Sequence, residues 1–199
     1  MDERKDFMFS RKDLQRLIIP LIVEQFLSIT IGMADTVMVS VCGEAAVSGV
    51  SLVDAINILM INIFSALATG GAIVSSQYIG REDLGKACEA AKQLVLAVFV
   101  LSTAIGAIFV FGGPQVLGLL YHDIEADVMA SAESYFFLTA LSYPFIALYN
   151  AGAALFRAMG NSKVSMTISI VMNCINIGGN ALFIFGFDMG AAGAALATL

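Results

Sequence analysis

The sequence predicts an all-α membrane protein, a polytopic bundle of transmembrane helices. Three observations predict this class: an apolar composition, segments long enough to span a bilayer, and basic residues confined to alternate connections. Hydrophobic residues make up 59% of the 199 positions and charged residues 13%, and the mean hydropathy is +0.88. Because a soluble domain carries about a quarter charged residues, this chain has too little polar surface for water. We therefore expect lipid to surround much of it.

Five segments contain the roughly 20 mostly apolar residues that a spanning helix needs. They cover residues 14–40, 53–79, 93–112, 132–156 and 164–187, and a partial sixth covers residues 190–199. A helix that stops inside the membrane leaves carbonyl groups unpaired in hydrocarbon, so we expect the chain to be part of a longer protein. Residues 1–13 precede the first span, and residues 14–199 are expected to form one membrane domain.

The connections between these spans differ in charge. The ten Lys and Arg residues lie before the first span or in its first turn, where Arg16 is found, between the second and third spans, or between the fourth and fifth, where Arg157 is found. The connections around Glu44, His122 and Asp188 contain none. The positive-inside rule therefore predicts a multi-pass protein of the cell membrane with a cytoplasmic N-terminus. Residues 81–93 and 115–134 are expected to form short amphipathic segments at the two membrane surfaces.

Polar side chains interrupt several of the apolar spans. Glu24 and Asp35 lie eleven residues apart in the first span, which places them on one face of a helix. The fifth span carries a polar stripe that ends in Asn173, Asn176 and Asn180. Ionisable groups in a membrane are costly and usually serve a function, which favours a water-accessible interior. Hydrogen bonding between helices is the alternative explanation of the amides and hydroxyls.

Four oxygen-bearing side chains are expected at one depth of the membrane, because the helices that carry them rise about 1.5 Å per residue. They are Asp35, Asn176, Asn180 and Thr198. A carboxylate, two amides and a hydroxyl are hard oxygen ligands suited to Na⁺, and the carboxylate equally binds a proton. We interpret them as a cation site for Na⁺ or H⁺. Possible cavity-lining residues are Glu24, Asn57, Asn173 and Tyr135.

Two further residues have a local explanation. Asp54 begins the second predicted span, where capping of a helix N-terminus accounts for a carboxylate. Pro20 lies inside the first span and lacks a backbone N–H, so we expect a kink there. The kink is either a static bend, which is common in membrane helices, or a hinge about which the first helix bends and straightens.

The sequence also argues against several classes of protein. Cys42, Cys88 and Cys174 form neither a disulfide framework nor a metal-binding pair. His122 is the only histidine, which argues against a histidine metal site or a catalytic triad. The sequence lacks a basic patch interleaved with aromatic residues, which would predict nucleic-acid binding. It also lacks an intramembrane catalytic motif, which would predict an enzyme. We expect no cofactor besides a coupling ion, and a channel remains an alternative.

Four ordered motifs resemble those of a known family. They are PLIVEQFLSITIGMADTVMVSVCGEAAVSGVSL, GGAIVSSQYIGREDLGKA, ALFRAMGNSKVSM and NCINIGGNALFIFGFDMGAAGAALAT. From about residue 14 to residue 199 the chain resembles the multidrug and toxin extrusion (MATE) exporters. The resemblance implies the N-terminal six-helix lobe of a two-lobe transporter, with its sixth helix incomplete and a C-terminal lobe as partner. It also implies antiport of H⁺ or Na⁺ against drugs or organic cations by alternating access.

The resemblance extends to individual residues. Asp35, Asn176 and Thr198 match a cation site of the family, with a backbone carbonyl at Ala194. Pro20 matches a proline of the first helix whose bending has been linked to protonation. The resemblance therefore implies that the coupling ion binds at the cation site around Asp35 and that α-helical bending occurs at Pro20.

The chain departs from the family pattern at one position of this site. Asn180 stands where some members carry Asp, so the site has one negative charge instead of two. An amide offers an oxygen ligand but takes no proton, and a single charge attracts Na⁺ less strongly. We therefore favour H⁺ as the coupling ion, with Na⁺ as the alternative.

The expected substrate is a cationic or neutral amphiphile, because no basic residue lies in a predicted span beyond its first turn. The alternative within the same superfamily is a flippase for lipid-linked oligosaccharides or polysaccharides. Such flippases usually line the interior of the lobe with Arg or Lys, which meet the phosphates of the substrate.

Overall fold

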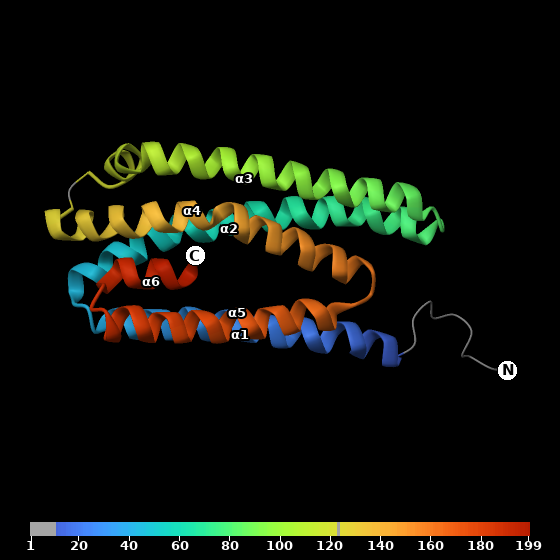
Figure 1. The fold of residues 1–199 in the computed structure, drawn as a ribbon, viewed down its shortest axis with the longest axis horizontal. Helices are drawn as coiled ribbons and strands as arrows, with labels where there is room; N and C mark the ends of the chain where they lie inside the picture. Colours follow the sequence, from blue (N-terminus) through green and yellow to red (C-terminus); the bar gives the residue numbers. More distant parts are fainter. Residues whose placement is uncertain (1–10, 123) are drawn as a thin grey trace.

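A computed structural model describes residues 11–122 and 124–199, and in this part of the chain it is helical throughout, with short turns between helices (Figure 1). The helices, in order, are α1 (Arg11–Ser40), α2 (Glu44–Gly80), α3 (Leu84–Leu120), α4 (Ala126–Ala158), α5 (Ser162–Asn180), a π-helical segment η1 (Ala181–Gly186) and α6 (Gly190–Thr198). Most of the predicted segment 1–13 lies outside the described residues, and its last three residues already belong to α1.

Five of the described helices are long and apolar enough to cross a membrane, as predicted. The helices α2 and α3 exceed their predicted spans most, because each contains 37 residues. A helix of that length measures about 55 Å, which exceeds the roughly 30 Å hydrocarbon core. The polar turns at the helix ends therefore belong to the same continuous helices as the apolar spans.

The two surface segments expected at 81–93 and 115–134 are corrected by the structure. Residues from Leu84 onward form the first turns of α3, and the Asp83 side chain caps that helix by accepting a 3.1 Å hydrogen bond from the Lys86 N–H. No Pro or Gly pair interrupts the chain between this cap and the apolar span, so the helix continues into the membrane. The outer segment is divided between two helices, because α3 ends at Leu120 and α4 begins at Ala126.

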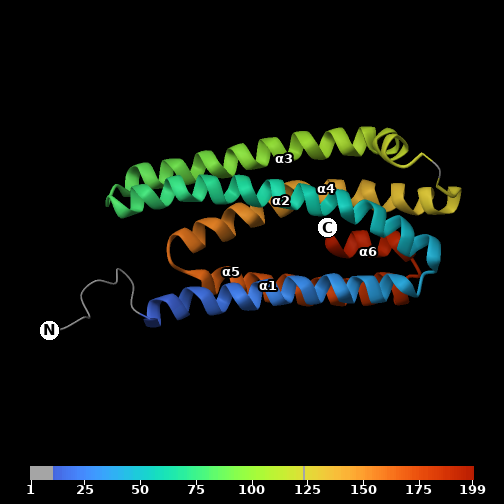
Figure 2. The same cartoon turned by 180° about the vertical axis from the view of Figure 1, so that it is seen from behind.

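The helices are arranged as two groups. Figures 1 and 2 show α2, α3 and α4 together on one side and α1 beside α5 on the other, with the short α6 between the groups. Buried aromatic and aliphatic side chains fill the contact of α2, α3 and α4, and Tyr143, Phe64 and Phe136 are the largest. Most apolar side chains of α1 are exposed, as a lipid-facing helix requires.

The contact between α3 and α4 depends on a glycine beside a proline. Pro144 has no N–H to offer the Ala140 carbonyl one turn earlier, so that oxygen lacks its usual helical partner. The same oxygen faces Gly106 of α3, where an added Cβ would lie 2.9 Å from it. Gly106 therefore permits α3 to pack closely against the point at which α4 is interrupted.

The π-helical segment η1 ends in a tight turn that directs α6 back along α5. Asp188 and Gly190 both adopt positive φ, 54° and 57° respectively, and Gly190 begins α6. Gly179 of α5 lies against Ala197 of α6, where an added Cβ would approach the Ala197 Cβ to 3.0 Å. This close packing brings the end of α6 beside the polar stripe of α5. The preceding segment η1 is π-helical, and π-helical turns are often found at functional sites.

Candidate functional site

A polar cavity of about 810 Å³ lies between the two groups of helices. Most helices of the fold contribute to it, and α1, α4 and α5 supply its charged residues and most of its amides. The polar lining consists of Glu24, Gln25, Ser28, Asp35, Asn62, Ser65, Tyr149, Asn150, Arg157, Ser169, Asn173, Asn176 and Thr198. The predicted water-accessible interior is therefore present, on the faces of α1 and α5 that the polar stripes indicated.

The five residues predicted as a cation site lie together at the α6 end of this cavity. The Asn180 amide donates hydrogen bonds to Asp35 Oδ1 at 2.5 Å and to Asn176 Oδ1 at 3.0 Å. The Asn176 amide donates to Thr198 Oγ1 at 3.3 Å, and the Thr198 hydroxyl donates to the Ala194 carbonyl oxygen at 3.1 Å. These bonds join α1, α5 and α6 through a single network.

The hydrogen bonds of this network place an N–H group between two of the predicted ligands. Asn180 is completely buried, and its Nδ2 stands between the Asp35 and Asn176 oxygens. Its own Oδ1 is buried without a hydrogen-bond partner. Rotation of the amide by 180° would turn this oxygen toward Asp35 and Asn176. The residues therefore fit a cation by their chemistry, provided that the Asn180 amide rotates.

A second polar cluster holds Glu24 at the opposite end of the cavity. The Ser165 hydroxyl donates to Glu24 Oε2 at 2.8 Å, and the Tyr149 hydroxyl donates to Oε1 at 3.2 Å. Arg157 forms an ion pair with Glu24 Oε1, with its Nη1 at 3.4 Å. Glu24, which we predicted as a possible cavity-lining residue, thus ties α1 to α4 and α5.

Arg157 corrects the expectation that no basic residue belongs to a span beyond its first turn. It lies in the last turn of α4 and lines the polar cavity. The charge rule placed it in a connection because a basic residue beside a span usually faces the cytoplasm. Asn150 and Arg157 are seven residues apart, close to two helical turns, and this spacing could have indicated a shared face. The argument for a cationic or neutral substrate loses its basis with this correction.

Asp54 also differs from its predicted role. It lies ten residues inside α2, which begins at Glu44, so it caps no helix. Its Oδ1 accepts hydrogen bonds from the Tyr135 hydroxyl at 3.1 Å and from the Asn57 amide at 3.5 Å. The Tyr143 hydroxyl donates in turn to Asn57 Oδ1 at 2.8 Å. Asn57 and Tyr135, which we expected to line the cavity, instead lie in this buried α2–α4 contact.

The other predicted residues are placed as follows. Asn173 lines the cavity, and its amide donates to the Ser169 carbonyl at 2.6 Å. Pro20 is buried within α1, which continues through it as one helix. Among the described residues no group of three or more His, Cys, Asp or Glu side chains could hold a metal ion. Any Na⁺ would therefore depend on the mixed oxygen ligands around Asp35.

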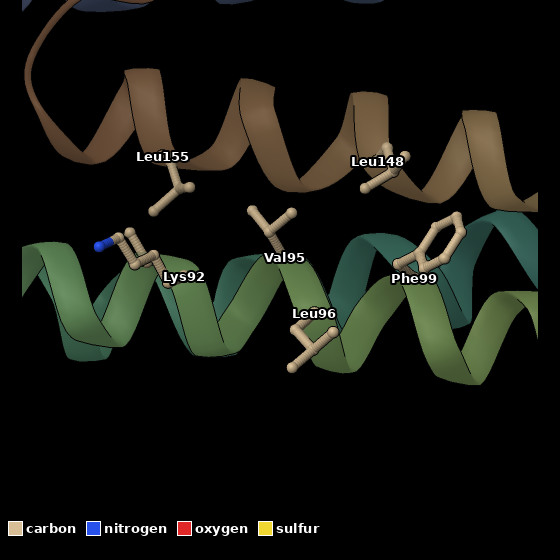
Figure 3. A pocket seen from close by; sticks show the side chains of 7 residues that line it. Lys92, Val95, Leu96, Phe99, Leu148 and Leu155 are labelled. Atoms are coloured by element: carbon tan, nitrogen blue, oxygen red, sulfur yellow. The ribbon is translucent and has the colours of Figure 1, made fainter.

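A second hollow of about 550 Å³ lies between α3 and α4 and is apolar (Figure 3). Val95 and Phe99 of α3 point toward α4, and Leu148 and Leu155 of α4 point toward α3. Lys92 supplies the only charge of its lining. Such a surface is typical of contact with lipid chains, so the polar cavity is the candidate functional site.

A bundle of membrane-spanning helices around an interior polar cavity with carboxylates at both ends defines a lobe of a multi-pass membrane transporter. The MatE family matches residues 20–182, more than half of the sequence. The chain belongs to this family, and the predicted class, an N-terminal lobe of a two-lobe MATE transporter, is confirmed.

Individual relatives agree with this assignment. The chain is 32% identical over 184 residues to the uncharacterised transporter YisQ of Bacillus subtilis, covering 90% of this chain and 40% of YisQ. It is 23% identical over 188 residues to the multidrug export protein MepA of Staphylococcus saprophyticus, covering 94% of this chain and 41% of MepA. It therefore spans about 40% of the length of the curated relatives that it matches.

A solved structure confirms the fold. The chain superimposes with a TM-score of 0.88 on a MOP superfamily transporter from Pyrococcus furiosus, covering 94% of this chain and 41% of that one. The two sequences are 21% identical.

Proposed function

We propose that this chain forms the N-terminal lobe of a cation-coupled antiporter that exports drugs and other organic amphiphiles by alternating access. The observation that carries the proposal is the Asp35 carboxylate, which lines an interior cavity and is bonded to the network on α5 and α6. An intramembrane carboxylate in such a position is typical of a coupling site. The similarity to the multidrug export protein MepA and to the probable multidrug resistance protein NorM of Thermotoga maritima supports an exporter.

The chemistry of Asp35 couples a cation to the arrangement of the helices. An ionised Asp35 accepts the hydrogen bond of the Asn180 amide, as described above. A protonated Asp35 becomes a donor, and the unpartnered Asn180 Oδ1 is the nearby acceptor to which it can turn. Proton binding thereby rotates the amide and breaks its bond to Asn176. A cation and a substrate then favour different arrangements of α1, α5 and α6, as antiport requires.

We propose H⁺ as the coupling ion. In the bonded arrangement the Asn180 N–H fills the position between the Asp35 and Asn176 oxygens that Na⁺ would need. Na⁺ must displace this amide and lose its water for the attraction of a single carboxylate, whereas a proton neutralises that carboxylate fully. The alternative coupling ion is Na⁺, bound by the oxygen atoms of Asp35, Asn176, Asn180 and Thr198.

The remaining parts of the proposal concern the setting of the protein. We propose that it lies in the cell membrane with its N-terminus in the cytoplasm, because the basic residues lie in alternate connections between the spans. The C-terminal lobe and the lipid bilayer are its proposed partners, and nucleic acid is not. We propose transport without an enzymatic activity and without a cofactor other than the coupling ion.

The test compares two carboxylates in the complete transporter. Asp35→Asn should abolish the dye efflux from proteoliposomes that a pH gradient drives, and it should show no efflux under a Na⁺ gradient. Asp127→Asn is the control, because Asp127 lies in the first turn of α4 and outside the cavity lining, and it should retain gradient-driven efflux. Size-exclusion profiles of both variants should match that of the wild type. Wild-type efflux by Asp35→Asn would refute the assignment of the coupling site.

The choice of ion is tested in the same vesicles by imposing each gradient separately. A pH gradient alone should drive export by the wild type, and a Na⁺ gradient alone should not. Asn180→Asp restores a second carboxylate and removes the N–H donor, so it should confer a response to Na⁺. Export driven by Na⁺ alone in the wild type contradicts H⁺ coupling, and an Asn180→Asp variant without any change contradicts a role of Asn180 in the site.

A further inference from the structure

We propose that the Glu24–Arg157 pair at the α4–α5 end of the cavity recognises the two opposite charges of a zwitterionic amphiphile. This inference rests on the proposed export function and names the class of substrate. It replaces the cationic or neutral substrate that the sequence predicted, because Arg157 lines the cavity.

The two charged groups are open to the cavity. Glu24 is 17% exposed and Arg157 28% exposed, and both belong to the lining. Their N–O separation of 3.4 Å is longer than the roughly 2.7–2.9 Å of a well-formed charge-assisted hydrogen bond. Neither charge is sealed inside the protein, so a ligand in the cavity can contact both.

Arg157 retains unused hydrogen-bond donors. Its contacts with described residues are both made by Nη1, to Glu24 Oε1 at 3.4 Å and to Ser165 Oγ at 3.5 Å. A guanidinium carries five N–H donors in a planar fork that suits a carboxylate or a phosphate. The Nε and Nη2 groups are therefore free, among the described residues, to bind an anionic group of a ligand.

The pairing of charges determines what kind of ligand the site accepts. A cation bound beside Glu24 is repelled by Arg157, and an anion bound beside Arg157 is repelled by Glu24. A molecule with adjacent opposite charges avoids both repulsions, because each of its charges faces the opposite charge of the protein. The Tyr149 ring next to Glu24 adds a surface on which an aromatic cation can stack.

The rest of the cavity suits the body of an amphiphile. Its volume of about 810 Å³ lies in the range of drug-sized sites. Leu21, Ile61, Ile146, Met172 and Ile175 line it beside the polar groups. An apolar or aromatic body can thus lie along the cavity while its paired charges meet Glu24 and Arg157.

The experiment uses two dyes that differ in one charge. Rhodamine B carries a carboxylate beside its cationic xanthene ring, and its ethyl ester has the same ring without the negative charge. Binding of each dye to the purified complete transporter is measured by fluorescence anisotropy, without any ion gradient. We expect the wild type to bind rhodamine B about tenfold more tightly than the ester, on the order of one well-placed charged hydrogen bond.

Variants of the Glu24–Arg157 pair distinguish ligand recognition from a purely structural role, in which the pair only holds α1, α4 and α5 together. Arg157→Gln should weaken the binding of rhodamine B and abolish its advantage over the ester, whereas binding of the ester should stay the same or become tighter, because the guanidinium no longer repels its cation. Arg157→Lys should restore part of the difference between the two dyes. Glu24→Gln should weaken both dyes, because both carry the cation. A purely structural role would make Arg157→Gln weaken both dyes alike.

Three results overturn the inference: wild-type protein that binds neither dye, wild-type protein that binds both equally, and equal losses of both dyes in Arg157→Gln. Because binding is measured without a gradient, the result does not depend on Asp35 coupling. Wild-type protein that discriminates between the dyes but shows no efflux under either gradient would refute the proposed ion mechanism alone. Wild-type protein with gradient-driven efflux but without dye discrimination would refute the substrate class alone.

Discussion

Substitution of Gly106 by alanine should weaken the contact between α3 and α4. The new Cβ would lie 2.9 Å from the Ala140 carbonyl oxygen and 3.9 Å from Pro144 Cδ. Because backbone atoms rather than a flexible side chain occupy this space, the two helices must move apart by about half an ångström. Overpacking of this kind costs about 1–3 kcal/mol. The free Ala140 carbonyl also loses its close approach to α3.

A control in the same helix isolates this effect. Gly112 of α3 has nothing within 4 Å of an added Cβ, so Gly112→Ala gains about 1 kcal/mol of helix propensity without a clash. The same gain applies to Gly106→Ala, and the difference between the variants therefore reports the clash alone. A difference of about 2 kcal/mol corresponds to roughly 4–8 °C for a domain of this size.

The assay is thermal unfolding of the complete transporter in detergent, followed by the loss of the monodisperse peak in size-exclusion chromatography. Gly112→Ala should unfold at or above the wild-type temperature and Gly106→Ala several degrees below Gly112→Ala. Equal unfolding temperatures for the two variants would refute the close contact between Gly106 and the Ala140 carbonyl.

Three further predictions follow from the described contacts. Tyr143→Phe should lower stability by about 1–3 kcal/mol in the same assay, because it leaves the buried Asn57 Oδ1 without its donor. Tyr78→Phe removes a hydroxyl that makes no hydrogen bond with the described residues, so it should have little effect. In a cysteine-free background, His122→Cys should react with an impermeant maleimide from outside the cell and Glu82→Cys only after permeabilisation; labelling of both from one side would contradict the topology. The hydrogen bond from the Lys86 N–H holds the pKa of the Asp83 carboxyl below its usual range, so the cap is fully effective above about pH 4 and is lost as the pH falls through the lowered value. Asp83→Asn should remove this acid dependence from thermal unfolding curves recorded between about pH 2 and pH 6, and an unchanged profile would argue against the cap.

The positions that the sequence predicted well are those fixed by helix geometry. A constant rise per residue places Asp35, Asn176 and Thr198 at one depth without any knowledge of side-chain contacts, and the structure brings them together. The same regularity allowed the five spanning segments to be recognised from their apolar length.

The direction of the hydrogen bonds could not be predicted in this way. Whether Asn180 offers its oxygen or its N–H depends on which groups surround it on three helices, and spacing along one helix carries no such information. Arg157 was misplaced because a long side chain at a helix end can turn back into the protein. Asp54 was misplaced because α2 begins at Glu44, nine residues before the predicted span.

The polar anchoring of α1 has a consequence for how the protein is made. Glu24 and Asp35 enter the membrane with the first helix, but Ser165 and Asn180, with which they bond, follow 141 and 145 residues later. At roughly 5–20 residues per second, each carboxyl group waits on the order of 10–30 s for its partner. An isolated carboxylate at the centre of a helix raises the free energy of inserting that helix into the bilayer by about 2.5–3.5 kcal/mol. Lipid alone therefore retains the newly synthesised α1 poorly. We therefore expect α1 to stay beside the insertion machinery during synthesis, and to leave it only when α5 emerges and the two helices enter the bilayer as a pair.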